Sequence, residues 1–348
     1  MDTLLIYGSY GYTGDLIARR ALDVGLEPIL AGRSAPKLRT QADDLGCAYR
    51  QFELDDVTSN IEDVDVVLHC AGPFVETYEP VVEACLETGT HYLDITGEIG
   101  VFEALQRYDE NATEAGVMVL PGVGFDVVPT DCLANRLHEQ LPEATELVLA
   151  FTGIPTMSSG SVRTLIEYIE RDTFVRRDGR IDPVASSDRT RRIDFGNGHG
   201  PRLTRAFSWG DVSTAYYSTG VPNISVYVPT SRRTLAWLSV KSLLAPALET
   251  EPVKAGLRTL ADRVAAGPDE HERATTETVV WGEATDGDET ASARLRTAET
   301  YEYTANAAIE IASRALSGDA PPGYQTPATA YGAALVTDID GGRWLKAP

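Results

Sequence analysis

A glycine-rich turn close to the N-terminus constrains the fold of this chain more than any other stretch. The apolar run Leu4–Tyr7 leads directly into the sequence GSYGYTG at 8–14, and apolar residues at helical spacing follow as far as Leu22. Strand, glycine-rich turn and helix, in that order, open a dinucleotide-binding βαβ unit. The spacing is G-x-x-G-x-x-G and not the stricter G-x-G-x-x-G. By itself the turn leaves dinucleotide binding and an ordinary glycine-rich turn equally open.

Each glycine of this turn has a physical role in the dinucleotide-binding interpretation. Gly8 permits the tight turn, Gly11 lets the backbone approach a pyrophosphate, and Gly14 lets the helix lie close to the strand. The start of the helix would then offer its N–H groups and the positive end of its dipole to the phosphates.

The first third of the sequence alternates between strand and helix patterns. Apolar runs predict strands at 4–7, 28–31, 48–54, 64–71, 91–95 and 117–120, and helical patterns predict helices that include 78–87 and 98–115. The run 64–71 is almost wholly apolar, as expected for a strand buried on both faces. Strands joined by helical crossovers predict an α/β fold over residues 1–131, a doubly wound parallel sheet of the Rossmann type.

The pattern changes after residue 131. Thr130 or Asp131 is expected to cap a helix that runs to Leu141. Predicted strands follow at 146–152, 191–195, 206–208, 223–228, 276–283 and 290–295, with helices at 161–171, 235–265 and 300–316. This mixture predicts an α+β domain built on a mostly antiparallel sheet over residues 132–325. A tail over 326–348 has a helical pattern at 328–336, and the sequence leaves open whether it returns to the first domain.

Composition narrows the range of partners and compartments. The chain has 348 residues, four cysteines and a formal net charge of −22 with only four lysines, a balance that resembles proteins from salt-loving cells. So acidic a surface argues against a nucleic-acid partner. The cysteines lack C-x-x-C and zinc spacings, and no H-x-x-x-H pattern occurs. We therefore expect no metal and a reducing cytoplasm, with Cys70 and Cys85 as buried thiols because they lie in apolar patterns.

Apolar segments indicate neither a membrane span nor a leader. No apolar stretch reaches spanning length, and the chain enters its first strand at once, which leaves no room for a signal peptide. The longest apolar segment, 235–248, is most simply explained by core packing. The alternatives are a homodimer face, a lid over an apolar substrate, or a helix on a membrane surface, and the net negative charge disfavours contact with anionic lipid.

Basic and hydroxyl side chains follow the second predicted strand. Arg33 lies where a Rossmann fold places the residue that reads the ribose, and arginine there suits the 2′-phosphate of NADP rather than the 2′-hydroxyl of NAD. Ser34 adds a hydroxyl donor, and Lys37 lies on the same side one turn further on. Given the glycine turn, we favour phosphate binding over an ordinary surface arginine.

The carboxyl ends of the other predicted strands supply further candidates, because ligands of open α/β sheets bind there. Asp55, after the third strand, would approach the adenine ring. The fourth strand ends in residues that would let backbone lie against the dinucleotide and form an apolar wall, namely Gly72, Pro73 and Phe74. His69, inside that strand, is expected to be a buried residue with satisfied hydrogen bonds.

Three acids lie at the ends of the fifth and sixth strands, on the side expected for the nicotinamide. Asp94, Glu98 and Asp126 are candidates for proton transfer or for orienting a substrate. Each also has a structural alternative, such as Glu98 as an acid favoured by a helix dipole or Asp126 as a partner of its own loop. The sequence leaves these alternatives open.

Several motifs, in this order, resemble one family. The segments GSYGYTGDLIA, AGRS, CAGPF, ACLETGTHYLDITGE and GVGFDVVPTD are similar to those of the saccharopine dehydrogenase-like NADP-binding family, which includes saccharopine reductases and trans-acting enoyl reductases. The resemblance covers roughly the first 135 residues. It implies a Rossmann domain and a second α+β domain used for substrate and often for dimerisation.

By position, the resemblance also assigns residues to a bound NADP. It implies contacts from the turn and the second strand end, by Gly8, Tyr10, Gly11, Tyr12, Thr13, Arg33 and Ser34. It places Gly72, Pro73 and Phe74 on the nicotinamide side. The turn departs from the G-x-G-x-V-G of saccharopine reductases of lysine metabolism, which favours the enoyl-reductase-like branch.

Two hypotheses about function follow. The first is an NADP-dependent oxidoreductase that transfers hydride to a C=C, C=N or C=O bond of a small or lipid-like substrate. The second is a non-catalytic NADP-binding regulatory or scaffold protein, because the sequence contains no obvious catalytic acid–base pair.

Overall fold

The computed structural model describes residues 3–152, 157–158, 162, 173–185, 189–196, 198, 200–235 and 267–345. The predicted helices at 161–171 and 235–265 lie outside these residues, apart from residues 162 and 235. The chain divides into two compact units, one made of residues 1–132 and 301–342, the other of residues 133–300 and 343–348.

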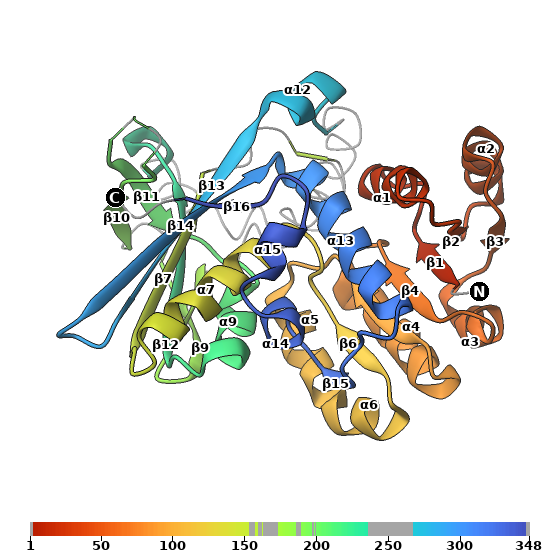
Figure 1. Cartoon of the computed structure of the whole chain (residues 1–348), viewed down its shortest axis with the longest axis horizontal. Helices are drawn as coiled ribbons and strands as arrows, with labels where there is room; N and C mark the ends of the chain where they lie inside the picture. The colour runs from red at the N-terminus through yellow and green to blue at the C-terminus, as the bar shows by residue number, and fades with distance from the viewer. Residues whose placement is uncertain are drawn as a thin grey trace, which may run out of the picture. The chain divides into compact units, whose positions relative to one another are not determined.

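The first unit is built on a parallel sheet (Figure 1). Its strands are β1 (Leu4–Tyr7), β2 (Ile29–Gly32), β3 (Tyr49–Gln51), β4 (Val66–His69), β5 (His91–Asp94), β6 (Met118–Leu120) and β15 (Gly323–Tyr324). Their order across the sheet is β15-β6-β5-β4-β1-β2-β3, and every pairing is parallel. The predicted doubly wound sheet is therefore confirmed, with one additional strand, β15, at its edge.

Helices follow most of these strands. They are α1 (Tyr12–Asp23), α2 (Ala35–Leu45), η1 (Leu54–Asp56), α3 (Val57–Ile61), α4 (Phe74–Thr88), α5 (Ile99–Leu105), η2 (Gln106–Tyr108), α6 (Asp109–Ala115) and α7 (Val128–Gln140). Two predicted boundaries were wrong. Helix α4 begins at Phe74 rather than near Tyr78, and the single helix expected over 98–115 is α5 and α6 joined by the 3₁₀ turn η2.

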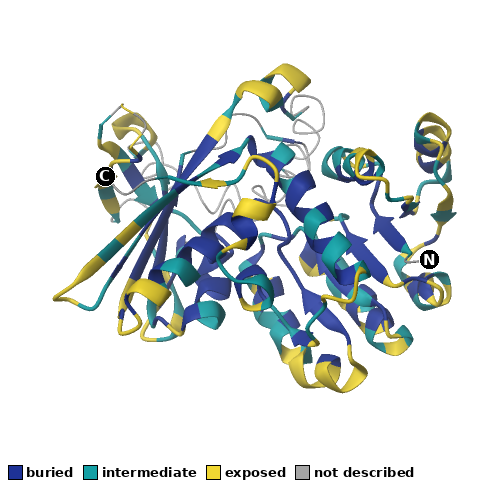
Figure 2. Cartoon of the chain, viewed as in Figure 1, coloured by how far each residue is buried: buried dark blue, intermediate teal, exposed yellow. Residues whose placement is uncertain are grey.

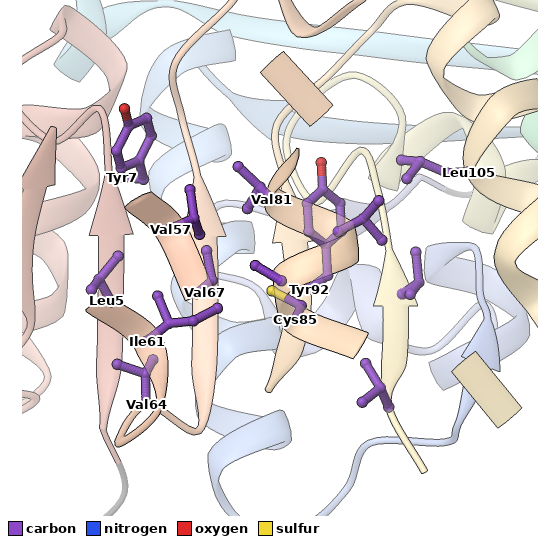
Figure 3. Close-up of a cluster of buried hydrophobic side chains, with 14 of the residues drawn as sticks. Leu5, Tyr7, Val57, Ile61, Val64, Val67, Val81, Cys85, Tyr92 and Leu105 are labelled. Atoms are coloured by element: carbon purple, nitrogen blue, oxygen red, sulfur yellow. The ribbon is translucent and has the colours of Figure 1, made fainter. Parts of the chain in front are cut away.

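The core of this unit lies between the sheet and its helices. Figure 3 shows Ile61 of α3 and Cys85 of α4 beside Leu5, Val67 and Tyr92 of the strands, and all five are fully buried. All four residues of β4 are buried, which agrees with its continuous apolar sequence. The exposed positions of Figure 2 fall mainly on the outer faces of the helices and on loops.

The C-terminal part of the chain completes the first unit. It consists of α13 (Thr300–Leu316), β15, α14 (Pro327–Tyr331) and α15 (Leu335–Asp338). The second domain was expected to run to residue 325, but residues 301–342 cluster with the first unit. The reason is that α13 buries Tyr303 and Ile311, while β15 extends the parallel sheet beyond β6. The helix predicted at 328–336 is interrupted at Gly332.

The predicted role of Asp131 as a helix cap was wrong. Helix α7 begins at Val128, so Asp131 lies inside its first turn and is fully buried. One oxygen of its carboxylate accepts the N–H of Ala328 at 2.8 Å. Asp131 therefore anchors the start of α14 to the first unit.

The second unit contains a mixed, mostly antiparallel sheet, as predicted (Figure 1). Among the described strands of this unit, only β12 and β7 pair in parallel. Its strands and described helices are β7 (Glu146–Phe151), β8 (Thr173–Arg177), β9 (Arg180–Val184), β10 (Thr190–Ile193), β11 (Arg202–Ala206), α9 (Asp211–Thr219), β12 (Asn223–Pro229), α12 (Glu270–Thr275), β13 (Glu277–Thr285), β14 (Thr290–Ala298) and β16 (Arg343–Trp344). The β8–β9 hairpin was missed, although its turn is the strong hairpin signal Asp178-Gly179. In the described part of the chain, no helix is long and apolar enough to cross a bilayer.

Candidate dinucleotide-binding site

The glycine turn has a backbone that accepts only glycine at two positions. Gly8 has φ +84°, and a Cβ there would lie 2.9 Å from the Cβ of Ala71. A Cβ at Gly14 would lie 2.5 Å from the carbonyl oxygen of Gly8. The N–H of Gly8 donates to the carbonyl of Ala31 at 2.8 Å, which ties the turn to the end of β2. The turn thus keeps α1 pressed against β1, as expected for Gly14.

The start of α1 is suited to an anion. Its N-cap residue is the exposed Gly11, and no described side chain caps the helix there. Asp15, the acid of the first turn, is already engaged, because its carboxylate accepts bonds from Arg19 (2.8 Å) and Gln41 (2.9 Å). A phosphate at this end would meet backbone N–H groups and the positive end of the helix dipole.

Cationic side chains lie at the end of β2. Arg33 and Lys37 are exposed, and Ser34 is half-buried at the N-cap of α2. The Tyr10 ring lies against Gly32, where a Cβ would be 2.7 Å from Cε1 of Tyr10. The Nζ of Lys37 lies 5.4 Å from the centroid of that ring. Asp55 is exposed in η1, just after β3.

The turn after β4, Gly72–Phe74, is held in place by its aromatic residue, Phe74. The Gly72–Pro73 peptide bond is cis, and Pro73 is the N-cap residue of α4. Phe74 is buried, with its ring edge-on to His69 at a centroid distance of 5.2 Å. The Nε2 of His69 is 2.9 Å from Oγ1 of Thr77. Burial lowers the pKa of His69 to about 3, so the ring is neutral. His69 is buried as expected, but its Nδ1 has no hydrogen-bond partner among the described residues, so the expectation of satisfied hydrogen bonds holds only for Nε2.

Asp94 and Glu98 are both buried and hydrogen-bonded. One oxygen of Asp94 accepts the N–H groups of Thr96 and Gly122, each at 2.9 Å, and the other accepts the hydroxyl of Tyr92 at 2.7 Å. Burial raises the pKa of Asp94 to about 6, even though these bonds act in the opposite direction. Asp94 thus connects the ends of β5 and β6, which favours its structural alternative over proton transfer.

The carboxylate of Glu98 binds the start of α4. Its two oxygens accept the N–H groups of Phe74 (2.9 Å) and Val75 (3.0 Å), and Glu98 is 3% exposed. The sequence suggested that Glu98 is favoured by the dipole of α5, the helix that it precedes. Instead its side chain serves the helix that follows the neighbouring strand.

Asp126 is the most accessible of the three acids. It is half-buried, and its carboxylate lies against Gly97, where a Cβ would be 1.8 Å from Oδ2. The ends of β5 and β6 therefore meet at this side chain. The peptide bond between Asp126 and Val127 is cis.

Two residues of α13 touch the same loops and were missed. The ring of Tyr301 is edge-on to Tyr12 of the glycine turn, with centroids 5.1 Å apart. Oγ1 of Thr304 accepts the N–H of Phe125 at 3.0 Å, in the loop after β6. These partners are so distant in sequence that no local pattern announces them. In the described part of the chain, no cluster of His, Cys, Asp or Glu is arranged to hold a metal ion.

The fold and the turn define a Rossmann-type dinucleotide-binding domain. Residues 4–120 match the family model described as the saccharopine dehydrogenase NADP binding domain. Over these residues, the match confirms the resemblance to the saccharopine dehydrogenase NADP-binding family that the motifs indicated.

Curated relatives of the chain include two kinds of protein. A trans-acting enoyl reductase of Mycobacterium ulcerans is 28% identical over 214 residues, which are 56% of this chain and 51% of that protein. A saccharopine dehydrogenase-like oxidoreductase of Rattus norvegicus is 33% identical over 180 residues, 45% of this chain and 41% of that protein. The matched regions thus cover about half of these relatives or less.

A solved structure shares the fold over the whole chain. Saccharopine dehydrogenase (L-Glu forming) from Saccharomyces cerevisiae superposes with a TM-score of 0.66 over 99% of both chains, at 12% identity. The likeness extends to the parallel sheet and to the second, mixed sheet.

Proposed function

We propose that this chain is an NADP-dependent oxidoreductase. The observation that carries the proposal is the pairing of a glycine cradle at the start of α1 with cationic side chains at the end of β2. The cradle would receive the pyrophosphate at Gly8, Gly11 and Gly14. Arg33 and Lys37, with the Ser34 hydroxyl, would bind the 2′-phosphate.

Other residues of the first unit would position the rest of the dinucleotide. The turn residues Tyr10, Tyr12 and Thr13 would contact it beside the cradle. Asp55 would lie near the adenine, and the turn Gly72–Phe74 would form the wall of the nicotinamide side. Bound NADPH supplies a hydride for a C=C, C=N or C=O bond. The similarity to a trans-acting enoyl reductase and to an oxidoreductase supports a reduction, with an enoyl group as the first substrate class to test.

Asp126 is the acid that we retain for proton transfer or substrate orientation. It is half-buried at the meeting point of two strand ends, whereas Asp94 and Glu98 hold backbone N–H groups. That engagement also favours the alternative function, a non-catalytic NADP-binding regulatory or scaffold protein, because it leaves fewer acids for chemistry.

A substrate screen followed at the absorbance band of reduced nicotinamide separates the two functions. Lipid-like enoyl compounds, cyclic imines and small carbonyl compounds are offered with NADPH at low and high KCl. The oxidoreductase predicts NADPH consumption with at least one class, at a rate that rises with enzyme concentration. Binding of NADPH without turnover in every class would favour the scaffold function.

A further inference from the structure

Glu98 connects the starts of two helices at neighbouring strand ends. Its own carbonyl oxygen accepts the N–H groups of Val101 (2.8 Å) and Phe102 (3.2 Å), which begin α5. Its carboxylate, as described above, accepts the first two N–H groups of α4. The N–H of Glu98 donates to Oγ1 of Thr96 at 3.1 Å. Backbone and side chain of this residue are therefore fixed in different elements.

The carboxylate supplies what α4 lacks. The first N–H groups of a helix have no partner within the helix and need acceptors from elsewhere. The N-cap residue of α4 is Pro73, whose side chain has no acceptor atom. Each oxygen of Glu98 takes one of these N–H groups, and the positive end of the helix dipole stabilises the buried charge.

We propose that Glu98 is a positioning residue for the dinucleotide, acting through the turn Gly72–Phe74. Gly72 is exposed and Pro73 half-buried, so the turn offers a surface to a ligand, while Phe74 anchors it on His69. Glu98 fixes the backbone immediately after that surface. The inference rests on the proposed function, in which this turn is the nicotinamide wall.

Two matched variants test the role. Glu98→Gln keeps the size of the side chain but replaces one acceptor oxygen by an NH₂ group, so one N–H at the start of α4 loses its acceptor. Glu76→Gln is the control, because Glu76 is an exposed acid in the same first turn of α4. Both variants remove one negative charge from this end of the helix.

The affinities for NADPH and for a fragment that lacks the nicotinamide distinguish a positioning role from general damage to the site. Adenosine 2′,5′-bisphosphate contains the 2′-phosphate end of NADPH but no nicotinamide. We expect Glu98→Gln to lower the affinity for NADPH about fivefold, which corresponds to the loss of a helix cap. The affinity for the bisphosphate should stay the same. Glu76→Gln should leave the affinity for both ligands unchanged. Equal weakening of both ligands by Glu98→Gln, or unaltered NADPH binding, overturns the inference.

Hydrogen exchange without ligand provides a readout that does not depend on the dinucleotide. In Glu98→Gln the amides of Phe74 and Val75 should exchange faster, while the last turn of α4 should exchange as in the wild type. Unchanged exchange at Phe74 and Val75 overturns the inference, even where the wild type binds NADPH. Faster exchange in a chain that binds neither ligand instead contradicts the proposed function, and the positioning role with it.

Discussion

At the residue scale, burial decides what the acids at the ends of β5 and β6 can do. Asp94 is the last residue of β5 and Asp126 follows the neighbouring strand β6, yet Asp94 is fully buried and Asp126 half-buried. The buried carboxyl of Asp94 loses hydration, which raises its pKa to about 6 despite three hydrogen bonds. Its ionisation state is therefore linked to stability.

The linkage predicts a pH signature for Asp94→Asn. Because the folded pKa of Asp94 lies above its unfolded value, the contribution of this group to stability is complete below pH about 4 and is lost as the pH rises through about 6. The free energy of unfolding of the wild type, relative to Asp94→Asn, should fall over this range and then level off. Urea unfolding across the range measures it.

Asp63→Asn is the control for that series. Its hydrogen bond with Arg50 lowers the pKa of Asp63, so its contribution should weaken as the pH falls, which is the opposite sign. Parallel curves for the wild type and Asp94→Asn would show that the pKa of Asp94 is not raised in the folded state.

Asp126→Asn tests proton transfer directly. With a substrate found by the screen, removal of an acid that transfers a proton lowers kcat by about 10²-fold or more and leaves NADPH affinity unchanged. Steady-state kinetics and calorimetry measure the two effects separately. An unaltered kcat and pH profile would show that Asp126 does not take part in the chemistry.

At the element scale, the glycine turn and the start of α1 are closely packed against each other. The three atoms nearest to a Cβ at Gly14 would all be backbone atoms, Gly8 O at 2.5 Å and two atoms of Ser9 at 2.9 Å. Backbone atoms cannot rotate away as side chains do, so α1 itself would have to move. A change at this contact should therefore affect both the stability of the fold and the ability of the glycine turn to accept a pyrophosphate.

Gly14→Ala should therefore harm stability and binding together. Steric strain of this kind costs about 1–3 kcal/mol, and NADPH affinity should fall in parallel. Gly100→Ala is the matched control, because a Cβ there meets no atom within 4 Å; placed in α5, it should stabilise by about 0.5–1 kcal/mol. Thermal unfolding and calorimetry provide both readouts. A Gly14→Ala variant as stable as the wild type would refute the close packing.

How far the sequence predicted each element depended on how local its signal is. Strands such as β4 carry their own apolar run and were found. Strand β15 has two residues, formed because Gly323 and Gln325 donate to the carbonyls of Val117 and Val119, and nothing in its own sequence marks it. The role of Glu98 was equally hidden, since its partner Phe74 lies 24 residues away.

At the scale of the whole molecule, two features matter most for stability: the net charge and the C-terminal segment 301–342. The chain carries a net charge of −22, so its folded form repels itself at low ionic strength. The segment 301–342 returns to the first unit, and Arg314 pairs with Asp338 at 2.7 Å there. The sequence left this return open for the tail 326–348 and wrongly assigned residues 301–325 to the second domain, because the return depends on contacts such as Asp131 with Ala328.

The charge predicts stabilisation by salt. Raising KCl from about 0.1 M to about 1 M shortens the Debye length from about 10 Å to about 3 Å and should screen the repulsion. Stabilisation by about 1 kcal/mol would raise Tm by roughly 2–4 °C. Sucrose, which is excluded from protein surfaces but does not screen charge, is the control. A Tm that stays level or falls in KCl would contradict the role of self-repulsion.

The proposed NADP site of the first unit combines the glycine cradle with Arg33. Calorimetric titration of the wild type and of Arg33→Ala with NADPH and with NADH tests it most directly. We predict that the wild type prefers NADPH, and that Arg33→Ala weakens NADPH about tenfold or more while NADH changes little. If neither dinucleotide binds at low or high KCl, or if Arg33→Ala loses the same affinity for both, the first unit does not bind NADP in this way.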